Sequence, residues 1–270
     1  MGIAGDLKNR AVIITGASSG IGRALAHECA QNGANIILAA RDKASLEESA
    51  GECRKLGGEP VVIPTDVSAA SQCQRLIDQT LDRFGRLDIL VNNAGISMWA
   101  YFEEMETLDP FEEIMRVNYF GAVYCTHYAL PYLKESSGRL VAISSLAGKS
   151  GIPTRSGYAA SKHAMVGFFD SLRIELADSG VSVTLIYPGF VASEIRKRAM
   201  DEHGEPKTVS PIREDKAMRP EVAAAKMFRA ILNRDRELVM TLRGRLGVWM
   251  KLVAPRLVDR IARRVIERGY

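Results

Sequence analysis

The sequence is poor in cysteine and in aromatic residues, and it contains no long apolar run. Four cysteines occur without the paired spacing of a metal site, at Cys29, Cys53, Cys73 and Cys125. We therefore expect four buried free thiols in a reducing compartment and no metal centre. No stretch is apolar over the roughly 20 residues that a helix needs to cross a bilayer. Residues 1–8 lack the apolar segment of a secretory signal and the Ser or Thr of a myristoylation signal, so we expect a cytoplasmic protein.

The residues that are present are sufficient for one sizeable core. The chain has 270 residues, of which 47% are hydrophobic and 25% charged, and no change of composition marks a linker. Apolar runs typical of buried strands recur between helix-like stretches, at 11–14, 36–40, 61–63, 87–91, 140–143 and 181–186. This alternation predicts an α/β fold with a doubly wound parallel sheet and helices on both faces. Ligands of such sheets bind beyond the carboxyl ends of the strands.

The first apolar run leads into a glycine-rich turn and the start of a helix. Gly16, Gly20 and Gly22 have the spacing G-x-x-x-G-x-G. Backbone N–H groups and the positive end of the helix dipole converge at such a junction, which suits a pyrophosphate. We assign to the three glycines a tight turn, a close approach of backbone to phosphate, and a helix-to-strand contact without a Cβ. The alternative is an ordinary loop.

Tyr158 and Lys162 are four residues apart, and Ser145 lies thirteen residues before the tyrosine. Residues i and i+4 share one face of a helix, so the ammonium of Lys162 is expected beside the phenol of Tyr158. A nearby positive charge favours the phenolate and lowers the tyrosine pKa from about 10 toward a range useful for proton transfer. Taken alone, the pattern also fits a surface helix with a lysine that extends to solvent.

Seven short motifs occur in an order and at separations that match a known family. They are the segment 15–22, Asp66-Val67, the segment 92–95, Asn118, Ser144-Ser145, Tyr158-x-x-x-Lys162 and Pro188-Gly189. Through them the sequence resembles the short-chain dehydrogenase/reductase family over most of its length, and segments 144–149 and 167–173 resemble its hydroxysteroid dehydrogenase-like branch. The resemblance implies a single-domain Rossmann fold over residues 1–242, with a substrate loop at about 190–218, followed by a C-terminal extension over 243–270.

The resemblance also implies catalytic roles. Tyr158 would be the general acid in carbonyl reduction and the general base in alcohol oxidation, and Lys162 would lower its pKa and bind the nicotinamide ribose. Ser145 would hydrogen-bond the substrate oxygen, with Ser144 as the alternative. Asn118 would bind a water that links Lys162 to solvent, or else be a buried residue at a helix bend.

Cofactor contacts are implied for a larger set of residues. These are Gly16, Ser18, Ser19, Gly20, Ile21, Gly22, Arg41, Asp66, Val67, Asn92, Ala94, Gly95, Tyr158, Lys162, Pro188, Gly189, Val191 and Ser193. Asp66 and Val67 would contact the adenine, although Asp66 also fits a cap or turn. Asn92 fits better as a residue that holds the sheet together. Ser193 stands where family members usually have threonine, and because it keeps the hydroxyl we expect its contact with the carboxamide.

The end of the second predicted strand bears on the form of the cofactor. Enzymes that use NAD commonly place a carboxylate about 20 residues after the glycines, where it binds the ribose 2′-hydroxyl. This chain has Ala40 there, followed by Arg41, whose guanidinium suits a 2′-phosphate. We therefore expect NADP (NADPH) rather than NAD. Asp42 is the alternative ribose ligand, but we interpret it as the N-cap of the next helix.

Two segments are expected to form the walls of a substrate site. The segment 96–102 is apolar and aromatic, which suits an apolar substrate or a subunit contact. The segment from 190 to about 218 is charged and resembles a mobile lid. Together with the family resemblance, these segments favour a lipophilic ketone, aldehyde or alcohol as substrate. The resemblance also implies a homodimer or homotetramer joined through the helices that carry Asn118 and Tyr158, with which Phe168, Phe169 and Leu172 are compatible.

The C-terminal extension departs from the minimal family pattern. From Arg243 to Arg268 there are eight basic and two acidic residues, a net charge of +6 where the whole chain carries +4. Apolar residues recur there at helical spacing after Trp249. A basic amphipathic helix can lie on an anionic membrane surface, so peripheral membrane contact is one interpretation. Packing on the protein's own domain or on a partner subunit is the other. No nucleic-acid-binding motif is present, and we expect no such partner.

Three functions are compatible with these features. They are an NADP-dependent oxidoreductase that interconverts a ketone or aldehyde and an alcohol, a non-catalytic NADP-binding sensor, and a membrane-associated scaffold. The intact set of Asn118, Ser145, Tyr158 and Lys162 favours the enzyme, because a sensor has no need of the phenol.

Overall fold

The computed structural model describes residues 7–208 and 217–267. The strands of its sheet are β1 (Ala11–Thr15), β2 (Asn35–Ala40), β3 (Glu59–Pro64), β4 (Ile89–Asn92), β5 (Arg139–Ile143), β6 (Ser182–Tyr187) and β7 (Glu237–Val239). The α-helices are α1 (Gly20–Gln31), α2 (Lys43–Lys55), α3 (Ala70–Phe84), α4 (Asp109–Met115), α5 (Gly121–Glu135), α6 (Ser156–Glu175), α7 (Pro220–Leu232), α8 (Leu242–Val253) and α9 (Pro255–Glu267). Short 3₁₀ turns η1 (Phe102–Glu104) and η3 (Leu146–Gly148) and a π-helical segment η2 (Arg116–Phe120) connect them.

The sheet is parallel throughout and has the strand order β3-β2-β1-β4-β5-β6-β7. This confirms the predicted doubly wound Rossmann fold. The chain runs outward from β1 to β3 and then returns to β4 beside β1, so the switch point lies between β1 and β4. Strand β7 was not predicted, because only two of its three residues, Leu238 and Val239, are apolar, and so short a run is not identified by periodicity.

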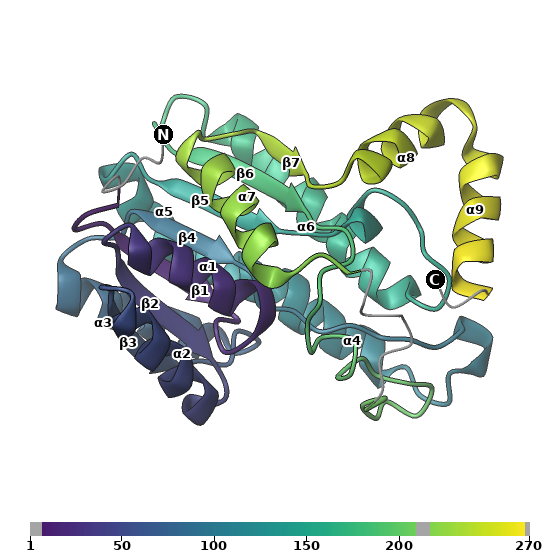
Figure 1. Ribbon diagram of the computed structural model, residues 1–270, viewed down its shortest axis with the longest axis horizontal. Helices are drawn as coiled ribbons and strands as arrows, with labels where there is room; N and C mark the ends of the chain where they lie inside the picture. Colours follow the sequence, from purple (N-terminus) through teal and green to yellow (C-terminus); the bar gives the residue numbers. More distant parts are fainter. Residues whose placement is uncertain (1–6, 209–216, 268–270) are drawn as a thin grey trace.

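Alternate residues of each strand enter two separate cores. In β1, Val12 and Ile14 pack with α1, α2 and α7, whereas Ala11 and Ile13 pack with α3, α5 and α6 on the opposite face. Figure 1 shows the strands running between these two layers of helices. Because both faces are covered by helices, we expect a ligand to bind at the carboxyl edge of the sheet, at which the predicted motifs lie.

Two of the residues compatible with a subunit interface belong to the protein's own core. Phe169 and Leu172 of α6 are buried against the sheet, so they do not support such an interface. Apolar residues lie on more than one face of α6, and the sequence alone does not show which face packs against the sheet. The four cysteines are free and buried, as expected. A homo-oligomer joined through α5 and α6 stays a prediction.

The C-terminal extension forms two helices where one was expected. Trp249 lies in α8, and the chain turns between Val253 and Pro255 before α9 begins. Figure 1 shows α8 and α9, in yellow, at the end of the molecule beyond β7. Within the described part of the chain, no helix has the length and apolar character needed to cross a membrane.

At the amino end of the sheet, a buried carboxylate ties β1 to β4. Asp88 accepts hydrogen bonds from the backbone N–H of Ala11 at 2.9 Å and from Arg10 and Arg86 at 2.8 and 2.6 Å. Burial alone would raise the pKa of Asp88, but the hydrogen bonds from Arg86, Ala11 and Arg10 outweigh it and hold that pKa below its usual range.

Replacing Asp88 by alanine should lower the free energy of unfolding by about 1–3 kcal/mol, because the N–H of Ala11 loses its acceptor in a buried site. The pKa of Asp88 is lowered by folding, so its stabilisation is present above about pH 4 and is lost as the pH falls through the native value. Urea unfolding of wild type, Asp88→Ala and the exposed control Asp82→Ala across acidic pH measures this. Equal losses in both variants, or a difference that persists unchanged in acid, would contradict the assignment.

Candidate active site

The glycine turn after β1 has the geometry of an anion cradle. Gly16 and Gly20 have φ values of +67° and +54°, in the left-handed region that favours glycine. A Cβ on Gly22 would lie 2.3 Å from the carbonyl oxygen of Gly16, so only glycine allows this helix-to-strand contact. Ser19 does not cap α1 with its side chain, which leaves the first N–H groups of the helix directed at the turn. Ser18, Ser19 and Ile21 are partly exposed there.

A hydrogen-bond network that was not predicted locks this turn to the end of β4. The amide of Asn93 donates to the carbonyl oxygens of Thr15 and Gly16 at 2.8 and 3.2 Å. The hydroxyl of Thr15 accepts from the N–H groups of Asn93 and Ala94, both at 3.0 Å. The sequence does contain a signal for this network. Two asparagines begin the segment 92–95, which follows the strand that lies beside the first strand in a Rossmann sheet. Asn92 itself donates to Thr126 of α5 at 3.1 Å, in agreement with its predicted structural role.

Ser145 and Tyr158 meet at the end of β5. The hydroxyl of Ser145 accepts from the N–H of Ala147 at 3.2 Å and lies close to the phenol of Tyr158, whose pKa it lowers as a hydrogen-bonding group. Ser144 is buried behind it and contacts the carbonyl oxygen of Lys162 at 3.3 Å. The structure therefore places Ser145, rather than Ser144, beside the phenol.

Lys162 lies on the same face of α6 as Tyr158, as the spacing predicted. Its Nζ is 5.9 Å from the centre of the Tyr158 ring and donates to the carbonyl oxygen of Ile143 at 2.9 Å. Burial lowers the pKa of Lys162 to about 8. The ammonium is thus held by the last residue of β5.

The pKa of Tyr158 is raised, whereas we predicted that Lys162 would lower it. The phenol is only 8% exposed, and this burial is the largest influence. The opposing effects are the positive charge of Arg155 and the hydrogen bond with Ser145. The prediction was wrong because helical spacing shows only that Tyr158 and Lys162 share a face. It does not show how deeply the phenol is buried or which group accepts the hydrogen bond of the lysine.

Arg155 is a site residue that sequence reasoning missed. Its guanidinium carbon lies 4.3 Å from the centre of the Trp99 ring and 5.9 Å from that of Tyr158. The side chain is 8% exposed, and burial, reinforced by the charge of Arg196, lowers the pKa of Arg155 to about 10 despite the opposing influence of Tyr158. It lies three residues before Tyr158 at the start of α6, which is the helical spacing that could have indicated it.

Asn118 occupies η2, where the helix widens between α4 and α5. Its Oδ1 accepts from the N–H of Ile96 at 2.8 Å, and its Nδ2 donates to the carbonyl oxygen of Ile96 at 3.0 Å and to Ser161 at 2.9 Å. The side chain is fully buried. This geometry supports the alternative of a buried residue at a helix bend, which positions the loop after β4. A Cβ on Gly95 would lie 3.1 Å from its Oδ1 and 3.5 Å from the Nζ of Lys162, so the three residues are close together.

The two predicted substrate walls pair with each other. Met200 exchanges backbone hydrogen bonds with Ser97 and Trp99 at 2.9 and 2.8 Å. Tyr158 packs in the same apolar cluster as Met98, Ile114, Ala147, Ala159 and Met200. Residues 190–208 of the predicted lid are therefore attached to the first wall, and residues 209–216 of the predicted loop lie outside the described residues.

The segment after β6 closes the site on its far side. Pro188 accepts from the N–H of Leu146 at 3.3 Å, which joins it to η3. Gly189 lies beside Leu146, and Val191 is buried and forms a bridge with Met218. A Cβ on Gly20 would be 3.1 Å from the Cβ of Ser193, so Ser193 faces the glycine turn.

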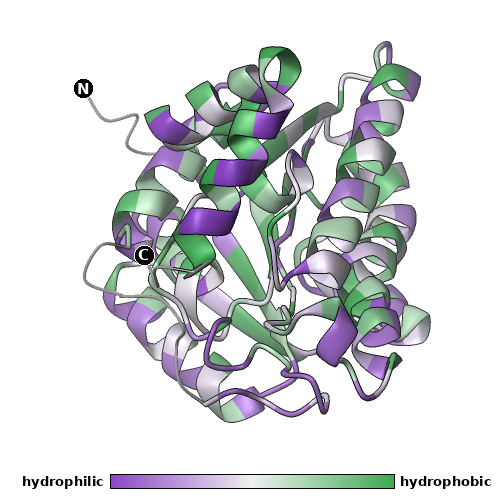
Figure 2. Cartoon of the chain, turned by 90° about the vertical axis from the view of Figure 1, so that its right-hand side faces the viewer, coloured by the Kyte–Doolittle hydropathy of each residue, from purple (hydrophilic) through white to green (hydrophobic). Residues whose placement is uncertain are grey.

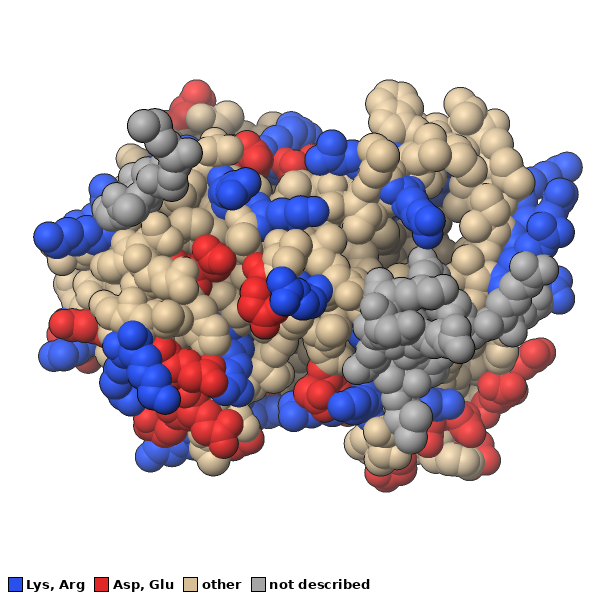
Figure 3. All heavy atoms as spheres, in the orientation of Figure 1, with Lys and Arg blue, Asp and Glu red and all other residues tan. Residues whose placement is uncertain are grey.

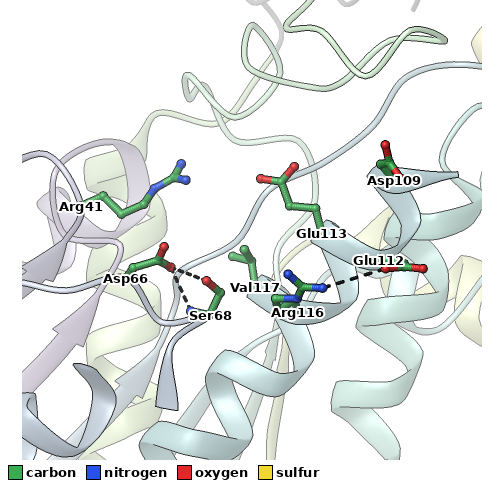
Figure 4. A pocket seen from close by; sticks show the side chains of 8 residues that line it. All are labelled: Arg41, Asp66, Ser68, Asp109, Glu112, Glu113, Arg116 and Val117. Atoms are coloured by element: carbon green, nitrogen blue, oxygen red, sulfur yellow. Dashed lines mark hydrogen bonds and ion pairs between the residues drawn. The ribbon is translucent and has the colours of Figure 1, made fainter. Parts of the chain in front are cut away.

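A cavity of about 400 Å³ opens beyond the ends of β2 and β3. Figure 4 shows Arg41 and Asp66 on one side and residues of α4 and η2 on the other. Asp66 borders this cavity and also accepts from the N–H and hydroxyl of Ser68 at 2.9 and 2.7 Å, so it forms the turn before α3 as well. The side chain of Val67 is instead buried, close to Gly121.

Fold and site together define a nucleotide-binding oxidoreductase of the Rossmann type. Residues 10–204 match the family model described as short chain dehydrogenase. An 11-beta-hydroxysteroid dehydrogenase A from Sesamum indicum is 40% identical over 264 residues, which cover 96% of this chain and 76% of that protein. The chain therefore belongs to the short-chain dehydrogenase/reductase family.

Two further relatives fit this assignment. An 11-beta-hydroxysteroid dehydrogenase-like 4A from Arabidopsis thaliana is 47% identical over 186 residues, which cover 68% of this chain and 62% of the relative. This chain thus spans less than two thirds of that protein. The crystal structure of a short chain dehydrogenase/reductase from Burkholderia phymatum in complex with NAD matches with a TM-score of 0.83 at 25% identity, covering 93% of this chain and 96% of the other.

Replacing Arg155 by glutamine should move the pH midpoint of kcat/KM for alcohol oxidation upward, because the phenolate of Tyr158 loses a neighbouring positive charge. Arg155→Lys keeps the charge and should restore a midpoint close to that of wild type. Cofactor affinity, measured in parallel, reports whether each variant is folded. A midpoint that does not move in Arg155→Gln would show that the guanidinium has no electrostatic effect on the phenol.

Proposed function

We propose that this protein is an NADP-dependent oxidoreductase that interconverts a ketone or aldehyde and an alcohol on a lipophilic substrate. The observation that carries the proposal is the contact of Ser145 with Tyr158, with Lys162 and Arg155 as the adjacent cations. A neutral buried phenol can donate a proton to a carbonyl oxygen, and a serine hydroxyl beside it can hold that oxygen in place.

The residues of the cleft fit a nicotinamide dinucleotide. The cradle of Gly16, Gly20 and Gly22 has no room for additional side-chain atoms at Gly22 and suits a pyrophosphate. Gly95 leaves space beside Asn118 and Lys162 at the catalytic end. When bound, the nicotinamide supplies or accepts the hydride of the reaction.

The preference for NADP is supported by Arg41 and by the use of Asp42 elsewhere. Asp42 caps α2 by accepting from the N–H groups of Ala44 and Ser45 at 3.0 and 3.4 Å, as its interpretation as an N-cap predicted. These capping bonds occupy the carboxylate that could otherwise bind a ribose hydroxyl. Arg41 follows β2 directly and extends into the cavity (Figure 4), where a guanidinium could bind a phosphate.

Replacing Arg41 by alanine should weaken NADPH binding about 10- to 100-fold, since hydrogen bonds to charged groups are worth about 1.5–3 kcal/mol. NADH binding should change by no more than about twofold, because its ribose lacks the phosphate. Titration of intrinsic fluorescence with each cofactor measures both constants, and Arg75→Ala on the exposed face of α3 is the matched control. An equal effect on NADPH and NADH would exclude phosphate recognition by Arg41.

A lipophilic substrate is supported by the surroundings of the phenol. Tyr158 lies among buried methionine, isoleucine and alanine side chains, and the partly buried Phe111 and Ile152 extend this cluster. Apolar walls of this kind favour an apolar ligand body. The names of the relatives, hydroxysteroid dehydrogenases, agree with such a substrate class.

Replacing Tyr158 by phenylalanine should reduce turnover about 10²- to 10⁴-fold, because the proton donor is lost. Cofactor affinity should stay within a few-fold of wild type. NADPH oxidation with steroid, retinal, acyl and sugar ketones identifies a substrate, after which Tyr158→Phe is compared with Tyr132→Phe in α5. Turnover retained in Tyr158→Phe would exclude this chemistry and leave the sensor or the scaffold as the function.

A further inference from the structure

The apolar residues of α8 form an exposed stripe. Leu242, Leu246, Trp249 and Val253 follow the spacing i, i+4, i+7 and i+11, so they share one face of the helix. Their side chains are between 60% and 83% exposed. Leu252, at 75% exposed, widens the stripe. A contiguous set of large apolar side chains at such exposure is typical of an interaction surface.

The opposite face of α8 packs against the Rossmann domain. A Cβ on Gly244 would lie 2.8 Å from Thr241 and 2.9 Å from Leu146, so the helix backbone touches η3 there. Lys251 on the same side donates to the carbonyl oxygen of Lys149 at 2.8 Å. These contacts set the rotation of α8 and direct the stripe away from the protein. The alternative that this part of the extension packs on its own domain therefore does not account for the stripe.

Positive charge accompanies the apolar surface on both helices. Arg243 and Arg245 are exposed, and their positions in α8 flank the stripe on either side. In α9, four exposed arginines share one face, namely Arg256, Arg260, Arg263 and Arg264. Figure 2 shows hydrophilic and hydrophobic bands alternating along the helix next to the C-terminus. Figure 3 shows the basic side chains along the outer edge of α9 and a surface of other residues over α8.

We propose that α8 and α9 dock on the surface of an anionic lipid bilayer, with the stripe in the interfacial region and the arginines against lipid headgroups. Exposed leucine and tryptophan flanked by arginine are the features by which interfacial helices bind membranes. A second copy of the chain is the less suitable occupant, because a two-fold contact through this surface would bring the arginines of both copies together. The inference does not depend on the proposed oxidoreductase activity.

Docking in this way would hold the catalytic end of the protein close to the bilayer. Helix α8 packs against η3, which begins one residue after Ser145. Thr241, the N-cap of α8, lies beside Gly189 of the same site. A lipophilic substrate dissolved in the membrane would then meet the site at the surface of the membrane.

The test is co-sedimentation of the full chain with vesicles of phosphatidylcholine alone and of phosphatidylcholine mixed with phosphatidylserine. We expect binding to the anionic vesicles that weakens as salt is added. The double variant Leu246→Gln and Trp249→Gln should reduce partitioning at least about tenfold. Ile174→Gln, which replaces an equally exposed residue of α6, should bind as wild type does.

A second variant separates charge from apolar contact. Arg260→Glu combined with Arg264→Glu should abolish the preference for anionic vesicles. Cofactor affinity measures folding in every variant, and it should remain unchanged. Binding of wild type to neither vesicle, or equal binding by the stripe variant, would overturn the proposal. Concentration-dependent dimerisation that the stripe variant abolishes, without vesicle binding, would assign the surface to a second copy instead.

Discussion

The chemistry proposed for this site depends on the burial of one phenol beside two positively charged side chains. Burial keeps Tyr158 in its neutral form, and the same low-dielectric surroundings strengthen its interactions with Arg155 and Ser145. Lys162 completes the arrangement from one helical turn away. The neutral phenol therefore lies next to the position that a substrate oxygen bound by Ser145 would occupy, where it could donate its proton. Its ionisation, which the proposed reverse reaction requires, depends on how far the charge of Arg155 and the hydrogen bond with Ser145 offset burial.

Backbone-anchored side chains hold this arrangement in place. Asn93 joins the turns after β1 and β4, Asn118 clamps the loop after β4, and Lys162 is tied to the end of β5. Each of these bonds joins segments that are distant in sequence and adjacent at the carboxyl edge of the sheet. The same edge carries η3, against which α8 packs, so the C-terminal helices and the candidate catalytic residues contact the same turn.

The sequence predicted the fold and the location of the site because motif positions and strand ends coincide. A parallel sheet brings all carboxyl ends to one edge, so residues that follow strands, such as Gly16 and Ser145, had to lie along that edge. The spacing of Tyr158 and Lys162 correctly predicted a shared helix face. Spacing could not indicate that the ammonium would bind the carbonyl oxygen of Ile143, because that contact depends on how α6 lies on β5. The role of Arg155 was missed for a similar reason, since its contact with Trp99 joins two distant loops.

The most direct test of the account is the ionisation of Tyr158 itself. Carbon-13 labelling of tyrosine Cζ, with the Tyr158 signal assigned by its absence in Tyr158→Phe, allows the phenol to be titrated by NMR in the cofactor-free protein. The account predicts that this signal stays that of the neutral phenol through the neutral range and begins to titrate only above the usual tyrosine pKa of about 10. A phenolate signal that develops near neutral pH in the cofactor-free protein would contradict it.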